Sequence, residues 1–548
     1  MNKSLYLTRV SLSGESIFIG VVGLMLFTFG FWHQPFIGFE ARFAVFAQEM
    51  WRHGPSLFPT TYGQPYPDYP ATSTFFVWLF SQPFGGVTKL SAVLPTACAA
   101  ALNLLITYRL LARFSRQWAL LTVAFEILTF NFLAEARSIS LDQMLATITL
   151  FAFYLVYTSH IDKRPVRLRL LPLLLILGFS IRGPLGVVIP AGVVGSYFLL
   201  SAQWRHLIVF GLIAAVTLAL CWMLLLYLAG HFYGADFVKE VVNMQVTGRM
   251  ESSAKLSHWY YLISSFGNYA LAYPLAVLVV LLLCAEKIIF RVDNHNQQQE
   301  FLTFLIGWVV VVIVGLSIPH TKKVRYLLPI VPAIAALAAY PLTTLHQSRV
   351  LKIVGVVLQK LLLVFPTIGI LAIVLASRHL HKGSESVHLP LIAVSTALIA
   401  CQLVSMLTYW RVEPQLRLIA PVAAAAMAAW FINLLFVEPL ALKMHDSSKL
   451  VNQVEALRQQ NPGDLVFFQI GKDAAAIKYV VNVNYDLQPI FLTDAAALDE
   501  LKNTAYLIVD DSELPLLKSA KKLSGLVPVV HDAFDHHQYS VFYLPGAG

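Results

Sequence analysis

The sequence has 548 residues, of which 57% are hydrophobic and only 13% are charged, with a mean hydropathy of +0.68. About a quarter of the residues of a soluble globular protein are charged, so this composition excludes that class and indicates a polytopic membrane protein. The formal charge of +9 does not indicate nucleic-acid binding, because the lysines and arginines fall mostly in short hinges between apolar segments. The four cysteines lie inside apolar segments and form neither a disulfide framework nor a zinc-binding spacing.

Apolar segments near the length of roughly 20 residues that crosses a bilayer predict about thirteen transmembrane helices. The first, residues 17–32, is followed by no small-residue cleavage site, so we expect a retained helix and not a signal peptide. Residues 71–84 are too few to span and include a proline, which predicts a helix at the membrane surface. The predicted spans begin near residues 16, 91, 117, 143, 169, 184, 205, 267, 301, 326, 352, 389 and 416.

The distribution of cations predicts the orientation of these spans. With Lys3 and Arg9 in the cytoplasm, most basic hinges also fall inside, as the positive-inside rule requires. The outer side then receives the loop 33–70, the segment 135–142, a turn at Arg182, the loop 230–266 and the tract 320–325. The tract 320–325 places cations on the outer side, against the rule. Either the predicted number of spans before it is wrong by one, or the cations there have a function.

The composition becomes polar after residue 445, which predicts two domains: a transmembrane domain over 1–445 and a soluble α/β domain over 446–548 on the outer side. Periodicity in the second domain predicts helices at 448–460 and 495–502, with a further helix between the first two strands. Strands are expected at 465–469, 489–492, 506–509 and 539–544.

Polar side chains of the first outer loop are the first candidates for a site. Phe39, Phe43, Phe46 and Met50 have helical spacing and predict a helix along the membrane surface. Glu40 and Arg42 are two apart on that helix, where they cannot face each other, so each needs another partner or ligand. Tyr66, Asp68 and Tyr69 follow among prolines that keep the chain extended, in either a rigid surface turn or a binding segment.

Three later segments add charge on the same side. Asp142 opens a predicted span, where it either caps the helix or belongs to a site. Arg182 precedes Gly-Pro between two apolar segments, and its guanidinium suits a phosphate or carboxylate. The cations of the tract 320–325 suit a lipid-borne phosphate. A histidine-rich segment at 531–537 is read as a solvated turn in preference to a metal site.

Taken in order, these motifs resemble those of the bacterial lipid A 4-amino-4-deoxy-L-arabinose transferases and, more distantly, the protein O-mannosyltransferases, which are membrane glycosyltransferases of the GT-C fold. The family motif Asp-Glu-x-Arg-Tyr-Ala is matched by residues 39–44, with Phe39 in place of the leading acid. Tyr-x-Glu-Lys-Pro-Pro is matched loosely by residues 66–71, with Asp68 for Glu and Tyr69 for Lys. Further matches are Ala-Arg-x-x-x-Leu-Asp at 136–142, Arg-Gly-Pro at 182–184, Trp-Tyr-Tyr at 259–261 and Tyr-Leu-Leu-Pro at 326–329.

The resemblance implies a sugar donor on a polyprenyl phosphate such as undecaprenyl phosphate, and an acceptor outside the cytoplasm, with lipid A or lipopolysaccharide favoured. It implies an acid that activates the acceptor, for which Glu40 and Asp142 are the candidates. Substrate-binding roles fall to Arg42, Tyr66, Asp68, Tyr69, Arg137, Arg182, Arg249, His258, Lys322, Lys323, Arg325 and Tyr326.

No cofactor and no divalent metal is required for this chemistry, because fixed cations can hold the leaving phosphate. We therefore expect a monomeric, multi-pass protein of the bacterial inner membrane with its site and C-terminal domain in the periplasm. The alternatives are a protein O-glycosyltransferase of the same fold, a lipid or glycan flippase, and a non-catalytic scaffold acting through residues 446–548.

Overall fold

The computed structural model of the chain describes residues 3–31, 34–248, 256–286, 297–346, 348–380, 390–411, 416–473, 475–483, 485–519, 525–534 and 537–546. The chain divides into two compact units. Unit 1 contains residues 1–30, 67–73 and 93–436, and unit 2 contains residues 31–66, 74–92 and 437–548. The last segment of unit 2 begins close to the predicted domain boundary, but the first outer loop, predicted as part of the transmembrane domain, groups largely with the C-terminal domain.

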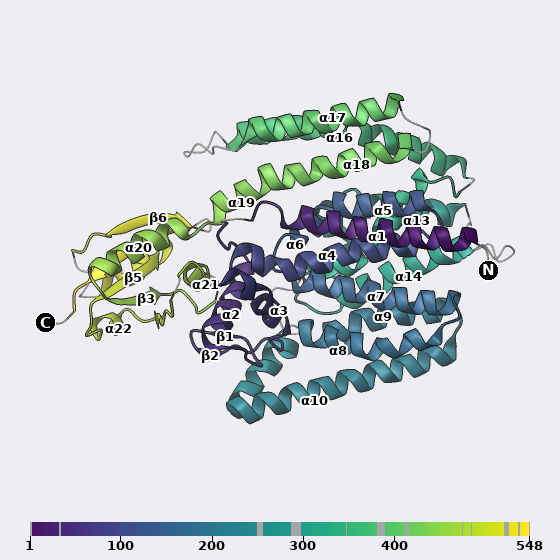
Figure 1. Ribbon diagram of the computed structural model, residues 1–548. Coiled ribbons are helices and arrows are strands. Elements are labelled where there is room, and N and C mark those ends of the chain that lie inside the picture. Colours follow the sequence, from purple (N-terminus) through teal and green to yellow (C-terminus); the bar gives the residue numbers. More distant parts are fainter. Residues whose placement is uncertain are drawn as a thin grey trace. The chain divides into compact units, whose positions relative to one another are not determined.

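Unit 1 is helical, and a helix lies at the start of every predicted span (Figure 1). Eight of the described helices are long and apolar enough to cross a bilayer, or up to ten if each of two bent pairs is one span. The predicted spans near residues 16 and 184 have shorter apolar helices, and the predicted span near residue 169 has a helix of only 12 residues, Leu171–Arg182. The helices are α1 (Lys3–Thr28), α4 (Lys89–Leu111), α5 (Arg116–Leu128), α6 (Phe130–Ala136), α7 (Leu141–Ile161), α8 (Leu171–Arg182), α9 (Leu185–Leu200), α10 (Trp204–Val242), α12 (Tyr260–Asn268), α13 (Ala272–Ala285), α14 (Gln297–Ser317), α15 (Val331–Ala339), α16 (Arg349–Leu380), α17 (Leu391–Arg411) and α18 (Leu416–Ile432).

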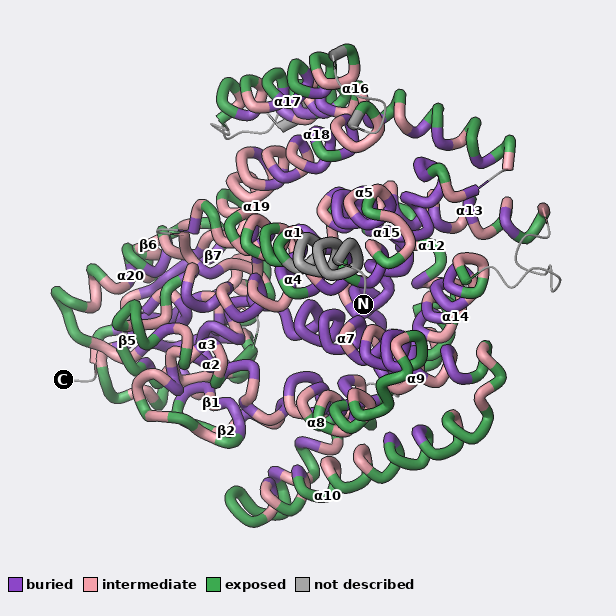
Figure 2. Tube along the Cα trace, turned by 45° about the vertical axis from the view of Figure 1, so that its right-hand side comes forward, coloured by how far each residue is buried: buried purple, intermediate pink, exposed green. Residues whose placement is uncertain are grey.

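Exposed apolar side chains identify the helices that face lipid. Leu212, Leu220 and Met223 of α10 are each more than 60% exposed, and Figure 2 shows this helix as mostly exposed along its length. Contiguous apolar surface of this extent is not stable in water. The chain is therefore a multi-pass membrane protein, as the composition predicts.

The helix α10 also corrects one expectation. The predicted outer loop 230–266 is helical up to Val242 and continues as a short π-helix, η3 (Asn243–Thr247), with a break at Gly234 (φ 88°). The helical spacing of apolar residues continues past residue 230, where the predicted span ends. The helix α10 is therefore longer than the predicted span.

The interior of unit 1 contains α7 and α15, whose residues are largely buried (Figure 2). Beside α7, the helices α8 and α9 form a hairpin with a very close approach. A Cβ added to Gly178 would lie 2.1 Å from the carbonyl oxygen of Gly186, and one added to Gly186 would lie 1.8 Å from that of Gly178. Only glycine at both positions permits this contact.

The C-terminal part of unit 2 is an α/β domain with the sheet order β4-β3-β5-β7-β6. The strands β4, β3 and β5 are parallel, and β7 pairs antiparallel with β5 and β6. Buried side chains such as Val466, Leu507 and Leu544 form the core. The bounds are α19 (Glu438–His445), α20 (Ser448–Gln460), β3 (Asp464–Phe468), α21 (Ala475–Val480), β4 (Ile490–Leu492), α22 (Ala496–Asp499), β5 (Ala505–Asp510), β6 (Val530–Phe534) and β7 (His537–Leu544).

The first outer loop supplies the rest of unit 2. It forms α2 (Glu40–His53), a small hairpin of β1 (Thr60–Thr61) and β2 (Gln64–Pro65), and α3 (Thr72–Ser81) followed by η1 (Gln82–Phe84). The helix predicted from the apolar stripe is present, but only Phe39 of the stripe is exposed. Phe43, Phe46 and Met50 are at most 4% exposed, because they pack inside the protein.

Candidate functional site

Asp142 lies in the first turn of α7, as predicted, but it is not the cap of this helix. The cap is Ser140, whose hydroxyl accepts a hydrogen bond from the backbone N–H of Gln143 at 3.3 Å. The backbone N–H of Ser140 in turn donates to the hydroxyl of Thr96 at 3.1 Å. Because Ser140 satisfies the helix end, the carboxylate of Asp142 is available for other partners.

Arg182 is the last residue of α8, and the next two residues turn the chain into α9. Gly183 has φ 60°, a conformation that favours glycine, and Pro184 sits at the start of α9, where proline is tolerated. A Cβ on Gly183 would lie 2.9 Å from a ring carbon of Tyr69. The Arg-Gly-Pro sequence therefore fixes the guanidinium at the end of a helical hairpin, beside an aromatic ring.

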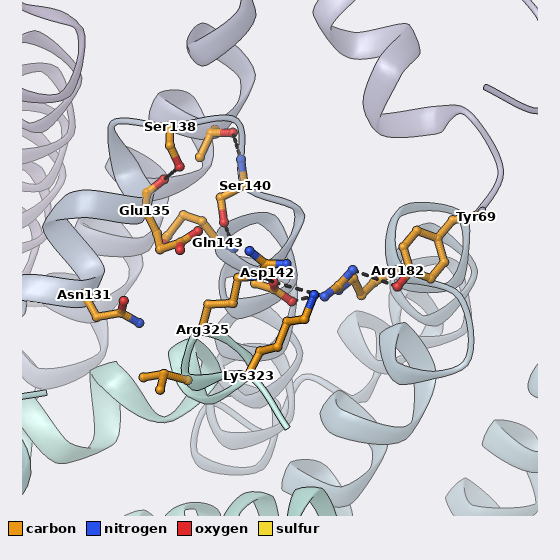
Figure 3. A network of polar contacts seen from close by, with 12 residues as sticks. Tyr69, Asn131, Glu135, Ser138, Ser140, Asp142, Gln143, Arg182, Lys323 and Arg325 are labelled. Atoms are coloured by element: carbon orange, nitrogen blue, oxygen red, sulfur yellow. Dashed lines mark hydrogen bonds and ion pairs between the residues drawn. The ribbon is translucent and has the colours of Figure 1, made fainter. Parts of the chain in front are cut away.

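Arg182 and Asp142 form a buried two-point ion pair (Figure 3). Nε of Arg182 donates to Oδ1 of Asp142 at 2.7 Å, and Nη2 donates to Oδ2 at 3.1 Å. Nη1 donates to the hydroxyl of Tyr69 at 2.7 Å. All three residues are at most 5% exposed, so the interaction takes place away from bulk water, where charges interact more strongly.

The basic tract leads into a 3₁₀ helix, η4 (Val324–Ile330), and contributes further groups to this cluster. Nε of Arg325 lies 3.1 Å from Oδ2 of Asp142. The ring of Tyr326 stands 5.0 Å from the guanidinium carbon of Arg182, which places the cation over the aromatic face. Figure 3 shows the side chain of Lys323 extending toward the same ion pair. We call Tyr69, Asp142, Arg182, Lys323, Arg325 and Tyr326 the ionic cluster.

Next to the ionic cluster lies a cavity of about 170 Å³ with a mainly apolar lining. Tyr326 belongs to both the cluster and the cavity wall. Gln245 also lines the cavity, and its amide donates to Oδ1 of Asp68 at 3.1 Å. The remaining wall is formed by Pro184, Leu185, Val246, Tyr261, Leu316, Pro319 and Thr321.

Other predicted site residues of unit 1 do not join the cluster through their side chains. Arg137 donates to the carbonyls of Leu26 and Phe29 at 2.8 and 2.9 Å, near the end of α1. Lys322 is buried and donates to the carbonyl of Pro319 at 2.7 Å. Both contacts fit structural roles, because they satisfy backbone carbonyls that helices and turns leave open. His258 is exposed, and Arg249 lies outside the described residues.

Glu40 belongs to unit 2 and forms an ion pair that the sequence did not predict. Its Oε1 contacts Nζ of Lys89, and the two side chains are only 6% and 7% exposed. The backbone N–H of Ile37 also donates to Oε1 at 3.3 Å. Lys89 stands at the outer end of a predicted span, against the positive-inside rule, and that departure was the signal that could have identified it.

Arg42 and Tyr66 are joined in unit 2, and they reach the C-terminal domain. Nη1 of Arg42 donates to the hydroxyl of Tyr66 at 3.0 Å, and this hydroxyl donates to Oδ1 of Asp473 at 3.0 Å. Nearby, the hydroxyl of Tyr62 donates to the carbonyl of Lys472 at 2.8 Å. Burial raises the pKa of Tyr62, and the carboxylates of Asp473 and Glu49 raise it further, so it remains a donor.

Among the residues that the structure describes, no three histidine, cysteine or acidic side chains come together as metal ligands do. The histidine-rich segment is partly described: His531 lies in β6 and contacts Asp511 at 2.8 Å, while Asp535 and His536 lie outside the described residues. The solvated turn predicted over 531–537 is wrong for its first residues, because residues up to Phe534 belong to the edge strand β6.

The chain is similar in sequence to known membrane glycosyltransferases. Residues 68–227 match the family described as dolichyl-phosphate-mannose-protein mannosyltransferase. Relatives include two undecaprenyl phosphate-α-4-amino-4-deoxy-L-arabinose arabinosyl transferases. The one from Pseudomonas aeruginosa is 26% identical over 58% of this chain and 59% of its own length. The one from Yersinia enterocolitica is 24% identical over 58% of each chain. The chain thus spans about three-fifths of the length of these relatives. The transferase of Pseudomonas savastanoi is 25% identical over 75% of this chain and 74% of its own.

The fold also matches solved structures over nearly the whole chain. The crystal structure of ArnT from Cupriavidus metallidurans in the apo state has a TM-score of 0.73 at 17% identity, covering 98% of this chain and 100% of that one. The same protein bound to undecaprenyl phosphate has a TM-score of 0.70 at 16% identity, with 98% and 99% covered. The predicted resemblance to the aminoarabinose transferases is confirmed by these matches, and the chain has the GT-C fold of those membrane glycosyltransferases.

Proposed function

We propose that this protein is a membrane glycosyltransferase that moves a sugar from undecaprenyl phosphate to an acceptor outside the cytoplasm, with lipid A as the acceptor. The observation that carries this proposal is the ionic cluster beside an apolar cavity, in which Asp142 and Arg182 are buried and Arg325 is partly buried. The names of the relatives support a pentose, 4-amino-4-deoxy-L-arabinose, as the transferred sugar.

The ionic cluster suits the leaving group of such a reaction. When the bond between the anomeric carbon and the phosphate oxygen breaks, negative charge grows on the lipid phosphate. Arg325 and Lys323 supply permanent cations there, while Asp142 and Tyr69 hold Arg182 in one orientation before the donor arrives. Cations fixed in advance need no reorganisation during the reaction, and in a dry site they stabilise charge more than they would in water.

The neighbouring cavity suits the lipid part of the donor. Its lining is mainly apolar, and it meets the cluster at Tyr326. A polyprenyl phosphate has the same order of parts, an anionic head followed by an isoprenoid chain. A cavity of about 170 Å³ is too small for a whole polyprenyl chain, so most of the chain would lie in the bilayer.

Orientation and acceptor complete the proposal. The cation distribution of the hinges supports a periplasmic position for the site and for the C-terminal domain. The match of residues 68–227 to protein mannosyltransferases favours a protein acceptor as the second candidate. We propose that transfer needs Glu40 and Asp142, that no divalent metal takes part, and that the monomer is active.

Mass spectrometry of envelope lipids and glycoproteins from cells with and without the gene tests the proposal. A pentose-sized mass difference on lipid A is the expected result, and the same difference on proteins alone would select the second candidate. No difference in either fraction would reject a transferase.

Adjacent lysines provide a matched pair of variants. Lys323→Gln removes a cation of the cluster and should lower transfer by about 100-fold, within the range for loss of one stabilising group. Lys322→Gln removes a lysine that donates to backbone carbonyls, and it should lower transfer less than Lys323→Gln does. Equal transfer by Lys323→Gln and the wild type would remove this lysine from phosphate binding.

A further inference from the structure

A second cavity of unit 1, of about 260 Å³, lies at the end of α7 that is far from Asp142. A helix of 21 residues is about 30 Å long, so this cavity and the ionic cluster lie at opposite ends of one membrane-crossing helix. The cavity is bordered by the end of α7, by a short 3₁₀ helix, η2 (Pro165–Leu170), and by the turn between α9 and α10. Its polar lining residues are Ser159, His160, Lys163, Gln203 and His206.

The polar lining consists of donors and carries positive charge. Lys163 is a permanent cation, and no acidic side chain of the described residues lines the cavity. The neighbouring acid, Asp162, is held by Arg113 and Arg167 at 2.9 and 2.8 Å. The amide nitrogen of Gln203 lies 3.1 Å from Nδ1 of His160 and can only donate, so the ring proton lies on Nε2. That N–H is a donor for a ligand, and the cavity therefore suits an anion.

Ser159 adds a buried donor that lacks an acceptor. The residue is only 4% exposed, and its hydroxyl has no hydrogen-bond partner among the residues that the structure describes. Buried polar groups are nearly always hydrogen-bonded, because an unpaired one costs free energy. Since Ser159 lines the cavity, an acceptor bound there would supply the missing partner.

Lys163 has a strained backbone at the point where α7 ends. Its φ is 52°, a left-handed conformation for which glycine or asparagine is the usual residue at the end of a helix. The backbone N–H of Arg164 donates to the carbonyl of Ser159 at 2.9 Å and closes this turn. Backbone strain of this kind is concentrated at functional positions. The turn places the cation of Lys163 beside the cavity.

The surface around the cavity is suited to lipid. Val166 of η2 and Trp204 and Ile208 of α10 are 66%, 59% and 70% exposed. Tryptophan is enriched at the level of lipid headgroups. Arg164 and Arg205 are exposed next to these apolar residues. Apolar surface that suits acyl chains thus meets a cationic cavity at the depth where lipid phosphates lie.

We propose that this cavity binds the phosphate of an anionic phospholipid whose acyl chains lie against α10. Lys163 supplies the charge, and Ser159 and His160 donate hydrogen bonds to the phosphate oxygens. Basic pockets between transmembrane helices suit anionic headgroups. A soluble phosphate compound would leave the apolar surface unused, so the lipid is the favoured source of the phosphate. The site lies at the other end of α7 from the proposed transfer reaction and goes beyond that function.

The test uses the full-length protein, freed of lipid in neutral detergent micelles, and native mass spectrometry to measure bound lipid. Phosphatidylglycerol should bind at least fivefold more tightly than phosphatidylcholine, whose headgroup has no net charge. Lys163→Asn should lower the affinity for phosphatidylglycerol about fivefold, the contribution of one cation near a membrane surface. Because asparagine tolerates the left-handed conformation, thermal unfolding of the lipid-free variant should match that of the wild type.

Two further variants serve as a control and as a second test. Arg169→Asn removes an exposed cation of η2 that does not line the cavity, so its affinity should stay within about twofold of the wild type. Ser159→Ala should weaken the binding of phosphatidylglycerol. It should leave the lipid-free protein at least as stable as the wild type, because it removes an unpaired buried hydroxyl.

Three outcomes would overturn the proposal. Equal affinity for the two lipids would show that the cavity does not select an anion. Equal losses in Lys163→Asn and Arg169→Asn would mean that general attraction to a basic surface explains the binding. Displacement of phosphatidylglycerol by an equal concentration of glycerol phosphate, which has no acyl chains, would assign the cavity to a soluble ligand. None of these measurements involves sugar transfer, so they stand or fall separately from the proposed function.

Discussion

Asp142→Asn is the substitution with the largest expected effect on the ionic cluster. Asparagine has the same shape, but it removes the negative charge between two guanidinium groups, Arg182 at 2.7 Å and Arg325 at 3.1 Å. Its amide also directs N–H groups at an arginine that can only donate. Breaking one partner of a buried ion pair costs about 3–5 kcal/mol. A native protein is stable by about 5–15 kcal/mol, so the variant should remain folded with a much smaller margin.

Equilibrium unfolding of the full-length protein in mixed detergent micelles measures this loss, and a double variant tests its cause. In Asp142→Asn with Arg182→Gln, charge and counter-charge are removed together, so the combined loss should be smaller than the sum of the two single losses by about 0.5–3 kcal/mol. Transfer should not return in the double variant, because the phosphate has lost a cation. Additive losses, or wild-type stability of Asp142→Asn, would refute the buried ion pair as the source of the effect.

Three further predictions concern separate contacts. Gly183→Ala should lower the free energy of unfolding by about 1–2 kcal/mol, because the residue has φ 60° and the added carbon meets an aromatic ring; unchanged thermal unfolding would contradict this. Glu40→Gln should abolish transfer and destabilise the protein, because it leaves Lys89 without its counter-charge. Adding Lys89→Met to that variant should restore the stability, as measured by thermal unfolding, but not the transfer. Transfer by Glu40→Gln equal to that of the wild type would exclude Glu40 from the mechanism. Hydrogen bonds from Arg113 lower the pKa of Asp162 to about 2. The charged carboxylate therefore stabilises the folded protein above pH 4, and this contribution is lost as the pH falls toward 2. The difference in unfolding free energy between the wild type and Asp162→Asn should shrink over that interval.

The sequence predicted those parts of the fold whose cause is local. Apolar segment length located all eight of the described helices that are long enough to cross a bilayer, although about thirteen spans were predicted. Amphipathic periodicity predicted the helix Ser448–Gln460 with the bounds that the structure has. The strand Val530–Phe534 was missed because it lies at a sheet edge and carries His531 and Asp532, so it lacks the apolar alternation of a buried strand. The buried stripe of Phe43 and its neighbours was read as membrane-facing, since spacing indicates a face and not what covers it.

The candidate site was predictable in its residue types and only partly in its contacts. The motif containing Asp142 and the Arg-Gly-Pro turn pointed to charges on one side of the membrane, and the structure pairs them. The pairing of Glu40 with Lys89 joins residues 49 positions apart, and no local pattern encodes it. Asp473, the hydrogen-bond partner of Tyr66, is a single acid in a polar loop, so nothing in the sequence distinguishes it from other exposed acids.

The joining of the first outer loop to the C-terminal domain has a consequence for biosynthesis. Gln48 donates to the carbonyl of Val481, a partner 433 positions later, and Tyr62 and Arg52 have partners at similar separations. The ribosome therefore releases this loop long before the residues that fix it exist. Membrane insertion of the early helices can proceed at once, but the loop reaches its final conformation only after the last hundred residues are made. A chain that stops early would thus carry nearly every one of these motifs and still lack the residues that fix the first outer loop.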